Sequence, residues 1–424
     1  MDSAVVPKFT SIPQELVDAI VNEVGEIETL KACSLVASTF RHPSRRLLLS
    51  SLTIEATKDH TPLSRLFSES PYIAKYVVCL TIKTPVNGKA SLDVECFSSI
   101  LANLQNVRGC TLEGEWHSPD DKHNSRDSKI PPLLLDFLAR QPLRELRLTH
   151  IELTPAVLWA FVAAVPVLCF QDVSMQEATT DTIAPAAVTS PPFFNSLVLS
   201  FGADVGRFLS RPENISCVTK LRHLSIKGYF HFQDAVWFDP LIQAASATLE
   251  HIQFDCSTRA SQPWPVALPP FPALGTVQFS IPGMVSGIEK TVVISEAVKS
   301  LSSLATPQMS PALANIIVNQ WDTSLGTFNR DESLYVPLMR KLDAVLMAYP
   351  TTLCIRWALA MYGEDRNWHW TRFVENMRRG MPGARTSGRL VLEDKYVRPQ
   401  PMSSTRTDWP RHTLSDCKKF LKDL

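Results

Sequence analysis

Side chains that could do bond chemistry are dispersed along this chain rather than gathered in known catalytic motifs. The 424-residue sequence contains 10 histidines and 9 cysteines. It has no GxSxG, GxxxxGK[ST], GxGxxG or HExxH motif. No histidine lies at metal-ligand spacing from another histidine or a cysteine. The sequence therefore predicts no catalytic residues, no metal site and no cofactor.

The histidines and cysteines fit a structural role better. His150, His223 and His251 fall in or beside segments that predict strands, so they are expected to face the surface of a sheet. The cysteines occur singly, without a CxxC pair, and most lie in apolar segments. Buried free thiols are typical of a reducing compartment, which predicts an intracellular protein, cytoplasmic or nuclear.

One aromatic cluster, formed by Trp368, His369 and Trp370 in the Arg-rich stretch 365–379, could stack on a ligand or nucleic acid. The chain carries 42 Lys+Arg and 42 Asp+Glu, a balance that argues against nucleic acid or an anionic membrane as the main partner. No run approaches the roughly eighteen apolar residues of a membrane span. We interpret the cluster as a cap on the end of a larger structure.

A repeated apolar pattern predicts the framework that carries these side chains. Segments of the form apolar-x-x-apolar-x-apolar recur, and VLCFQDV around Phe170 fills a double-length gap between two of them. Helix-like stretches lie between the segments. A period of 20 to 29 residues with this pattern indicates leucine-rich repeats. The sequence thus predicts an α/β fold, with residues 56–400 forming an irregular leucine-rich-repeat-like solenoid around a curved parallel sheet.

Side chains alternate across a strand, so each repeat should present one face to the core and one to solvent. The predicted core anchors are Leu146, Leu148, Leu197, Leu199, Leu224, Ile226, Ile252, Phe254, Val277 and Phe279. Their neighbours should line the concave face, where repeat proteins bind partners. The candidate target-binding residues on that face are Glu145, Arg147, Thr149, Val198, His223, Ser225, Lys227, His251, Gln253, Asp255 and Gln278.

A small helical module is predicted before the repeats. Leu16, Val17, Ile20 and Val21 form one apolar stripe, and a second helix is expected from Leu30 to a stop at Pro43. About forty residues cannot bury a core alone. Part of this apolar surface should therefore pack on another chain or on the following domain. An ordinary helical cap on a larger domain would satisfy the same pattern.

This segment resembles an F-box of the fungal, mushroom-type kind. The resemblance rests on Ile12-Pro13-x-Glu15-Leu16, on Ile20, and on the Leu-x-x-Cys-x-x-Val helix from Leu30 to Val36, with Phe40 in place of the usual Trp. It implies a three-helix module over residues 8–55 that binds a Skp-family adaptor and, through it, a cullin. The adaptor-binding positions that it implies are Ile12, Pro13, Leu16, Val17, Ile20, Leu30, Cys33, Leu35 and Val36.

The resemblance and the repeats together predict a non-catalytic substrate-receptor subunit of a ubiquitin ligase. Its repeat domain would bind an unknown target protein, with neither nucleic acid nor membrane as a partner, and residues 401–424 would form a C-terminal tail. Two alternatives stay open: a repeat scaffold without a ligase role, and an unrecognised α/β enzyme.

Overall fold

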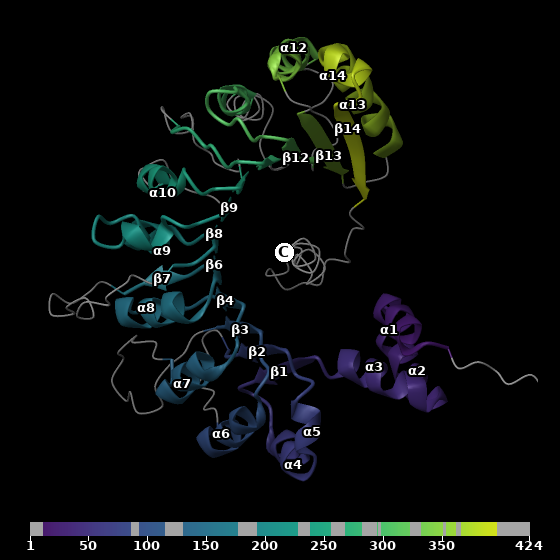
Figure 1. The fold of residues 1–424 in the computed structure, drawn as a ribbon, viewed down its shortest axis with the longest axis vertical. Helices are drawn as coiled ribbons and strands as arrows, with labels where there is room; N and C mark the ends of the chain where they lie inside the picture. The colour runs from purple at the N-terminus through teal and green to yellow at the C-terminus, as the bar shows by residue number, and fades with distance from the viewer. Residues whose placement is uncertain are drawn as a thin grey trace, which may run out of the picture.

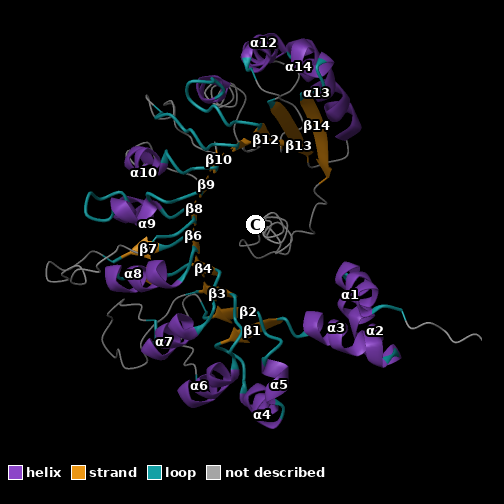
Figure 2. Cartoon of the chain, viewed as in Figure 1, coloured by secondary structure: helices purple, strands orange, loops and turns teal. Residues whose placement is uncertain are grey.

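The computed structural model describes residues 12–85, 93–114, 130–176, 193–227, 238–255, 268–281, 295, 298–322, 332–350, 353–361 and 366–396. Within these residues the chain is an α/β protein built on one parallel sheet of twelve strands, with a second sheet of two short strands. Figure 1 shows the large sheet along the inner side of an arc and the helices that connect its strands along the outer side, whereas the N-terminal helices stand apart beside the β1 end. Figure 2 shows the same division by secondary structure.

Strands of the large sheet follow one another in chain order, and neighbouring strands are parallel. They are β1 (Ser51–Glu55), β2 (Cys79–Lys83), β3 (Gly109–Glu113), β4 (Glu145–Thr149), β6 (Val167–Gln171), β8 (Ser196–Ser200), β9 (His223–Lys227), β10 (His251–Asp255), β11 (Thr276–Ile281), β12 (Asn315–Asp322), β13 (Cys354–Met361) and β14 (Leu390–Tyr396). The small sheet pairs β5 (Glu152–Leu153) with β7 (Ser174–Met175). This order, in which each unit contacts the next, is the arrangement of a solenoid.

Helices connect the strands and precede the first of them. Those before β1 are α1 (Gln14–Glu23), α2 (Ile27–Val36) and α3 (Ser38–Leu48). Those of the repeats are α4 (Thr61–Glu69), α5 (Pro71–Ala74), α6 (Val94–Asn103), α7 (Pro132–Arg140), α8 (Pro155–Ala164), α9 (Ala203–Leu209), a 3-10 helix (Ile215–Val218), α10 (Phe238–Ala245), α12 (Glu332–Ala348), α13 (Arg366–Gly380) and α14 (Pro382–Thr386).

The main core lies between the sheet and the helices that connect its strands. Leu197 pairs with Leu224, Leu224 with Ile252, and Ile252 with Val277, so the predicted anchors of successive repeats are direct cross-strand neighbours. All ten predicted anchors are buried. The expected unit around Phe170 is β6, which lies between β4 and β8. The parallel sheet and its inward-facing residues are therefore confirmed.

The last repeats are larger than the earlier ones. β12 and β13 have 8 residues each, whereas β4, β6, β8, β9 and β10 have 5. The longer strand β12 buries a further residue, Gln320, two positions after the anchor Val318, and the indole Nε1–H of Trp357 on β13 donates to Oε1 of Gln320 at 3.1 Å. This bond pairs the indole N–H of one fully buried residue with the amide oxygen of another. β11, β12 and β13 begin at Thr276, Asn315 and Cys354, so these units exceed the period of 20 to 29 residues that predicts the repeats.

Several repeats turn at the same place. The residue directly after β3, β4, β6 and β8 has a left-handed backbone, with φ of 105° at Gly114, 55° at His150, 52° at Asp172 and 55° at Phe201. The N–H of each of these residues donates to a carbonyl oxygen at the end of the next strand, at distances of 2.7 to 3.0 Å. The left-handed turn thus extends the hydrogen-bond ladder by one residue. Three of these four residues carry a Cβ, which disfavours this conformation.

The position of Pro43 in the helical module differs from the expected one. α2 ends at Val36, and Pro43 lies inside α3 rather than after α2. A proline lacks the N–H that would bond to the carbonyl four residues earlier, here Thr39. The side-chain amide of Gln14 donates to this Thr39 oxygen at 3.3 Å. A residue of α1 thereby replaces the missing helical bond. The sequence around Pro43 alone could not predict this contact.

The boundary between module and repeats also differs from the expected one. β1, within the predicted 8–55 module, pairs with β2, so the sheet begins at Ser51. The backbone oxygen of Ser50 accepts hydrogen bonds from the N–H groups of Val78 and Cys79, both at 2.9 Å. The module is therefore tied directly to the first repeat. Residues 401–424, the predicted tail, lie outside the described residues.

A buried aspartate joins two C-terminal helices and gives a stability prediction. The carboxylate of Asp343 on α12 accepts from the backbone N–H groups of Gly383 at 2.9 Å and Ala384 at 2.7 Å, at the start of α14. Replacing Asp343 with Ala leaves two donors without this acceptor. We expect a loss of about 2–3 kcal/mol in the free energy of unfolding, measured by denaturant titration. The control is Asp136→Ala at an exposed site of α7, and equal stability of the two variants would contradict the prediction.

Candidate protein-docking surfaces

The module divides its apolar residues between a core and a surface. Val17 and Val21 on α1 and Leu30 on α2 are buried against one another, with Phe40 and Leu47 of α3 packed around them. Two of the nine predicted adaptor-binding positions, Val17 and Leu30, therefore belong to the module's own core. Cys33 is half-buried. The sequence could not separate these residues from the others because both kinds share the same apolar periodicity.

The remaining predicted positions are exposed. The exposed fractions are 54% for Ile12, 56% for Leu16 and 54% for Ile20, which follow one another at intervals of four residues. At the end of α2, Leu35 is 83% exposed and Val36 is 77% exposed. Pro13, just before α1, is exposed as well. These exposed apolar side chains make this part of the module a candidate surface for contact with another protein.

One exposed apolar residue was missed. Ile27, the first residue of α2, is 62% exposed. It stands outside the Leu-x-x-Cys-x-x-Val pattern that defined the second helix. Ile27 lies three residues before Leu30 and continues the spacing of Leu30, Cys33 and Val36, and this spacing was the signal available in the sequence.

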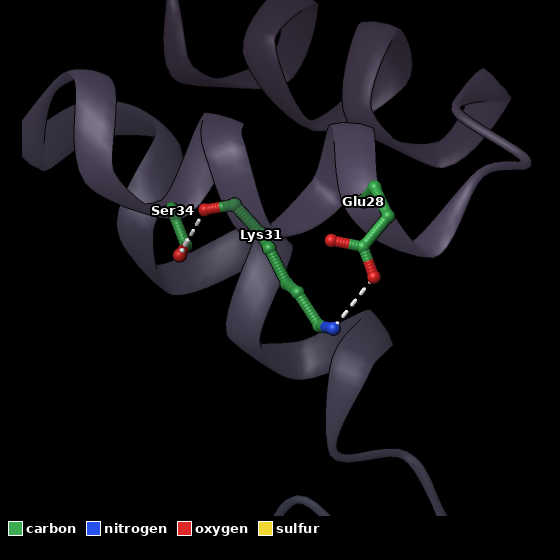
Figure 3. A network of polar contacts seen from close by, with 3 residues as sticks. All are labelled: Glu28, Lys31 and Ser34. Carbon is green, nitrogen blue, oxygen red and sulfur yellow. Dashed lines mark hydrogen bonds and ion pairs between the residues drawn. The ribbon is translucent and has the colours of Figure 1, made fainter.

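Polar groups accompany the apolar residues on α2. Figure 3 shows Lys31 paired with Glu28 at 2.7 Å, and the hydroxyl of Ser34 donating to the backbone oxygen of Lys31 at 2.7 Å. Residues three and four apart lie on one side of a helix, so Leu35 lies next to Lys31 on this side. An exposed ion pair contributes little to stability. It can instead supply a polar margin to an apolar contact.

The second candidate surface is the concave face of the sheet. Half-buried and buried residues alternate along β2, β3 and β6, and the fully buried ones point toward the helices. Glu145, Arg147 and Thr149 on β4 accordingly face the inner side of the arc. Arg147 pairs with Glu145 at 3.4 Å. The same alternation places Val198, Ser225, Lys227 and Gln278 on this face, whereas the side chain of Asp255 lies outside the described part of the structure.

Two imidazoles lie side by side on the concave face. The rings of His223 on β9 and His251 on β10 have centroids 6.1 Å apart. Burial lowers the pKa of both, and the neighbouring His223 and Lys227 lower the pKa of His251 further, to about 4. Both rings are therefore neutral at pH 7. In the next row of side chains, the hydroxyl of Ser225 donates to Oε1 of Gln253 at 3.1 Å.

The His251 pKa predicts acid sensitivity. In the unfolded chain this group titrates near 6.5 and in the folded chain near 4, so between these values the unfolded state binds more protons. Stability should thus fall as pH drops from 6.5 to 4, by about 2–3 kcal/mol from this residue. Melting temperatures measured at pH 7 and pH 4.5 should differ less for His251→Gln than for the wild-type protein. An unchanged difference would contradict the assignment.

Two buried cysteines are poorly suited to act as nucleophiles. Burial raises the pKa of the Cys110 and Cys217 thiols, which disfavours the reactive thiolate. In the part of the chain that the structure describes, no group of three or more His, Cys, Asp or Glu side chains could hold a metal ion. Among the same residues, no helix combines the length and the apolar character needed to cross a membrane.

The aromatic cluster lies on α13, beside the last strand at the C-terminal end of the arc (Figure 1). Trp370 packs on the buried Phe373, with ring centroids 5.6 Å apart. The side chains of Trp368 and His369 lie outside the described part of the structure. The contact of Trp370 fits a capping role better than ligand stacking.

Comparison of the sequence with protein-family models finds no match, and comparison with curated proteins finds none either. The function must therefore be inferred from the two surfaces themselves. One is the set of exposed apolar side chains of the helical module: Ile12, Leu16 and Ile20 in and just before α1, and Leu35 and Val36 at the end of α2. The other is the broad polar concave face of the sheet.

Proposed function

We propose that the protein is the substrate-receptor subunit of a Skp–cullin–F-box ubiquitin ligase. The observation that carries this proposal is the exposure of Ile12, Leu16, Ile20, Leu35 and Val36 on the three-helix module. These are positions at which the F-box resemblance implies contact with a Skp-family adaptor. Their side chains are not used by the module's own core, which leaves them available to a second protein.

The parallel sheet supports a division of tasks along the chain. We interpret the repeats as leucine-rich-repeat-like and their concave face as the target-binding surface. The module would dock on the adaptor and, through it, on a cullin, inside the cell. The subunit itself would catalyse no reaction. It would act by raising the effective concentration of target lysines near the ubiquitin-transferring enzyme.

The attachment of the module favours such a role. α3 leads into β1 through two residues, and the rings of His42 on α3 and Tyr76 after α5 meet with centroids 5.5 Å apart. A short connection with side-chain contacts limits the relative motion of two units. A target held on the repeats would then keep a defined position relative to the adaptor.

Co-expression of the full chain with a Skp-family adaptor and a cullin tests the proposal. We expect a stable complex containing one copy of each protein, with adaptor affinity in the submicromolar range, about −8 kcal/mol or tighter. Size-exclusion chromatography with light scattering and calorimetry provide the two measurements. A chain that folds but forms no complex would favour the repeat scaffold without a ligase role.

A further inference from the structure

A neutral region occupies the middle of the concave face. In the first two inner rows of β6, β8, β9, β10, β11 and β12, no residue is of a charged type. We call this region the neutral face, and it consists of Val167, Cys169, Ser196, Val198, His223, Ser225, His251, Gln253, Thr276, Gln278, Asn315 and Ile317. Charged residues make up 20% of the whole chain, so twelve neighbouring positions without one form a distinct surface.

Charges border this region: Lys227 lies in the next inner row of β9, and ion pairs lie at both ends. On β4, Arg147 lies 3.4 Å from Glu145. On the other side, Arg356 of β13 lies 3.1 Å from Glu393 of β14. The nearest arginines of the concave face therefore each have a carboxylate partner on the same face. An anionic ligand would have to displace these carboxylates before it could pair with either arginine.

Phosphate recognition by proteins uses clusters of arginines that form several charge-assisted hydrogen bonds. The neutral face has no such cluster, and its two imidazoles carry no positive charge at pH 7 because burial lowers their pKa. Nucleic acid would require the same cations. The chemistry of this surface thus opposes a phosphorylated or polyanionic ligand.

The groups that are present match a polypeptide backbone. A primary amide carries an acceptor oxygen and two N–H donors, the same kinds of group that a peptide unit offers. Oε1 of Gln253 accepts from Ser225, which leaves the amide nitrogen of Gln253 free to donate to a ligand. Gln278 lies next to Gln253 on the adjacent strand. Val198 and Ile317 add apolar contact on either side.

The size of the region fits an extended segment. Six strands at about 4.8 Å spacing span about 24 Å. An extended chain covers about 3.3–3.6 Å per residue, so about seven residues would cross the neutral face. We propose that the neutral face binds an extended segment of the target that is uncharged and not phosphorylated. This inference rests on the proposed function in that it names the class of target that the receptor selects.

The test uses random twelve-residue peptides displayed on phage, selected against the full chain without the adaptor. We expect enriched peptides to be poor in charged residues in their central part. Replacing Gln253 and Gln278 together with Leu, which roughly keeps their volume, should weaken binding of the synthetic best peptide at least tenfold. Phosphorylation of a central Ser or Thr in that peptide should weaken it at least tenfold as well. Fluorescence anisotropy gives the affinities.

The matched control replaces Thr53 and Thr81 with Val on the inner face of β1 and β2, away from the neutral face, and should leave peptide affinity unchanged. Enrichment of acidic peptides, tighter binding of the phosphorylated form, or no enriched peptide at all would overturn the inference. Adaptor affinity is measured for the same variants. If the wild-type chain bound enriched peptides but no adaptor, the ligase role alone would be refuted, whereas adaptor binding without any enriched peptide would refute the neutral-face inference alone.

Discussion

Replacing Leu16 and Ile20 together with Ala should weaken binding to a Skp-family adaptor by at least about 100-fold, or about 2.8 kcal/mol. Both side chains are more than half exposed, so the module should stay folded without them. Alanine is the strongest helix former, which preserves α1. Burying a leucine or isoleucine side chain against a partner contributes about 1.5–3 kcal/mol, and two such losses account for the expected effect. Calorimetric titration of the adaptor into the full chain measures it.

A matched control comes from the repeats. Leu66 on α4 and Val94 on α6 are 41% and 63% exposed, and changing both to Ala should leave adaptor affinity within twofold of wild type. Val17→Ala provides the opposite case, because Val17 is 1% exposed and its loss should destabilise the module itself. Undiminished adaptor binding by the Leu16/Ile20 variant would remove these residues from the interface.

Strand identity was predictable because the repeats bury every second residue. The anchors Leu197, Leu224 and Ile252 are spaced by 27 and 28 residues and lie side by side in the sheet. Periodicity fixes which strand residues share a face, and a constant period fixes which strands are neighbours. Both rules weaken when the period changes, as it does from β11 to β12.

Periodicity does not predict which apolar residues of the module are buried and which are exposed. Leu16 and Val17 are adjacent in sequence and equally apolar, yet one is exposed and the other buried. The difference depends on where α2 and α3 pack, which periodicity of α1 alone does not determine. The helix containing Pro43 is a second case, since it depends on a hydrogen bond from Gln14 that is 25 residues from its acceptor.

The left-handed turns after the strands form a third case. Glycine or asparagine usually marks such a turn, but among the four turns only Gly114 does so, while His150, Asp172 and Phe201 adopt a left-handed backbone with a Cβ present. Their conformation follows from the ladder, since each N–H is held by a carbonyl of the next strand. The pairing with the next strand determines the turn, so the residue type at the turn does not predict it.

Gly114 is the turn that should tolerate substitution least. Its φ is +105°, outside the range that residues with a Cβ adopt easily, and a Cβ placed there would lie 2.0 Å from the backbone oxygen of Thr84. Its N–H also donates to the oxygen of Thr149 at 2.9 Å, so the backbone cannot shift without losing this bond. Gly114→Ala should therefore lower the free energy of unfolding by about 3–5 kcal/mol. Denaturant titration followed by circular dichroism measures the loss.

Two other glycines distinguish the cost of a left-handed backbone from the cost of a steric clash. Gly388 has a φ of +70° with open space around it, so Gly388→Ala should show the backbone term alone, about 1–2 kcal/mol. Gly25 has neither a positive φ nor an atom within 4 Å, and Gly25→Ala should change stability by less than about 0.5 kcal/mol. The expected order of destabilisation is Gly114, then Gly388, then Gly25. If Gly114→Ala proved no worse than Gly388→Ala, the contact with Thr84 would not be closely packed, and the first repeats would have room to shift relative to one another.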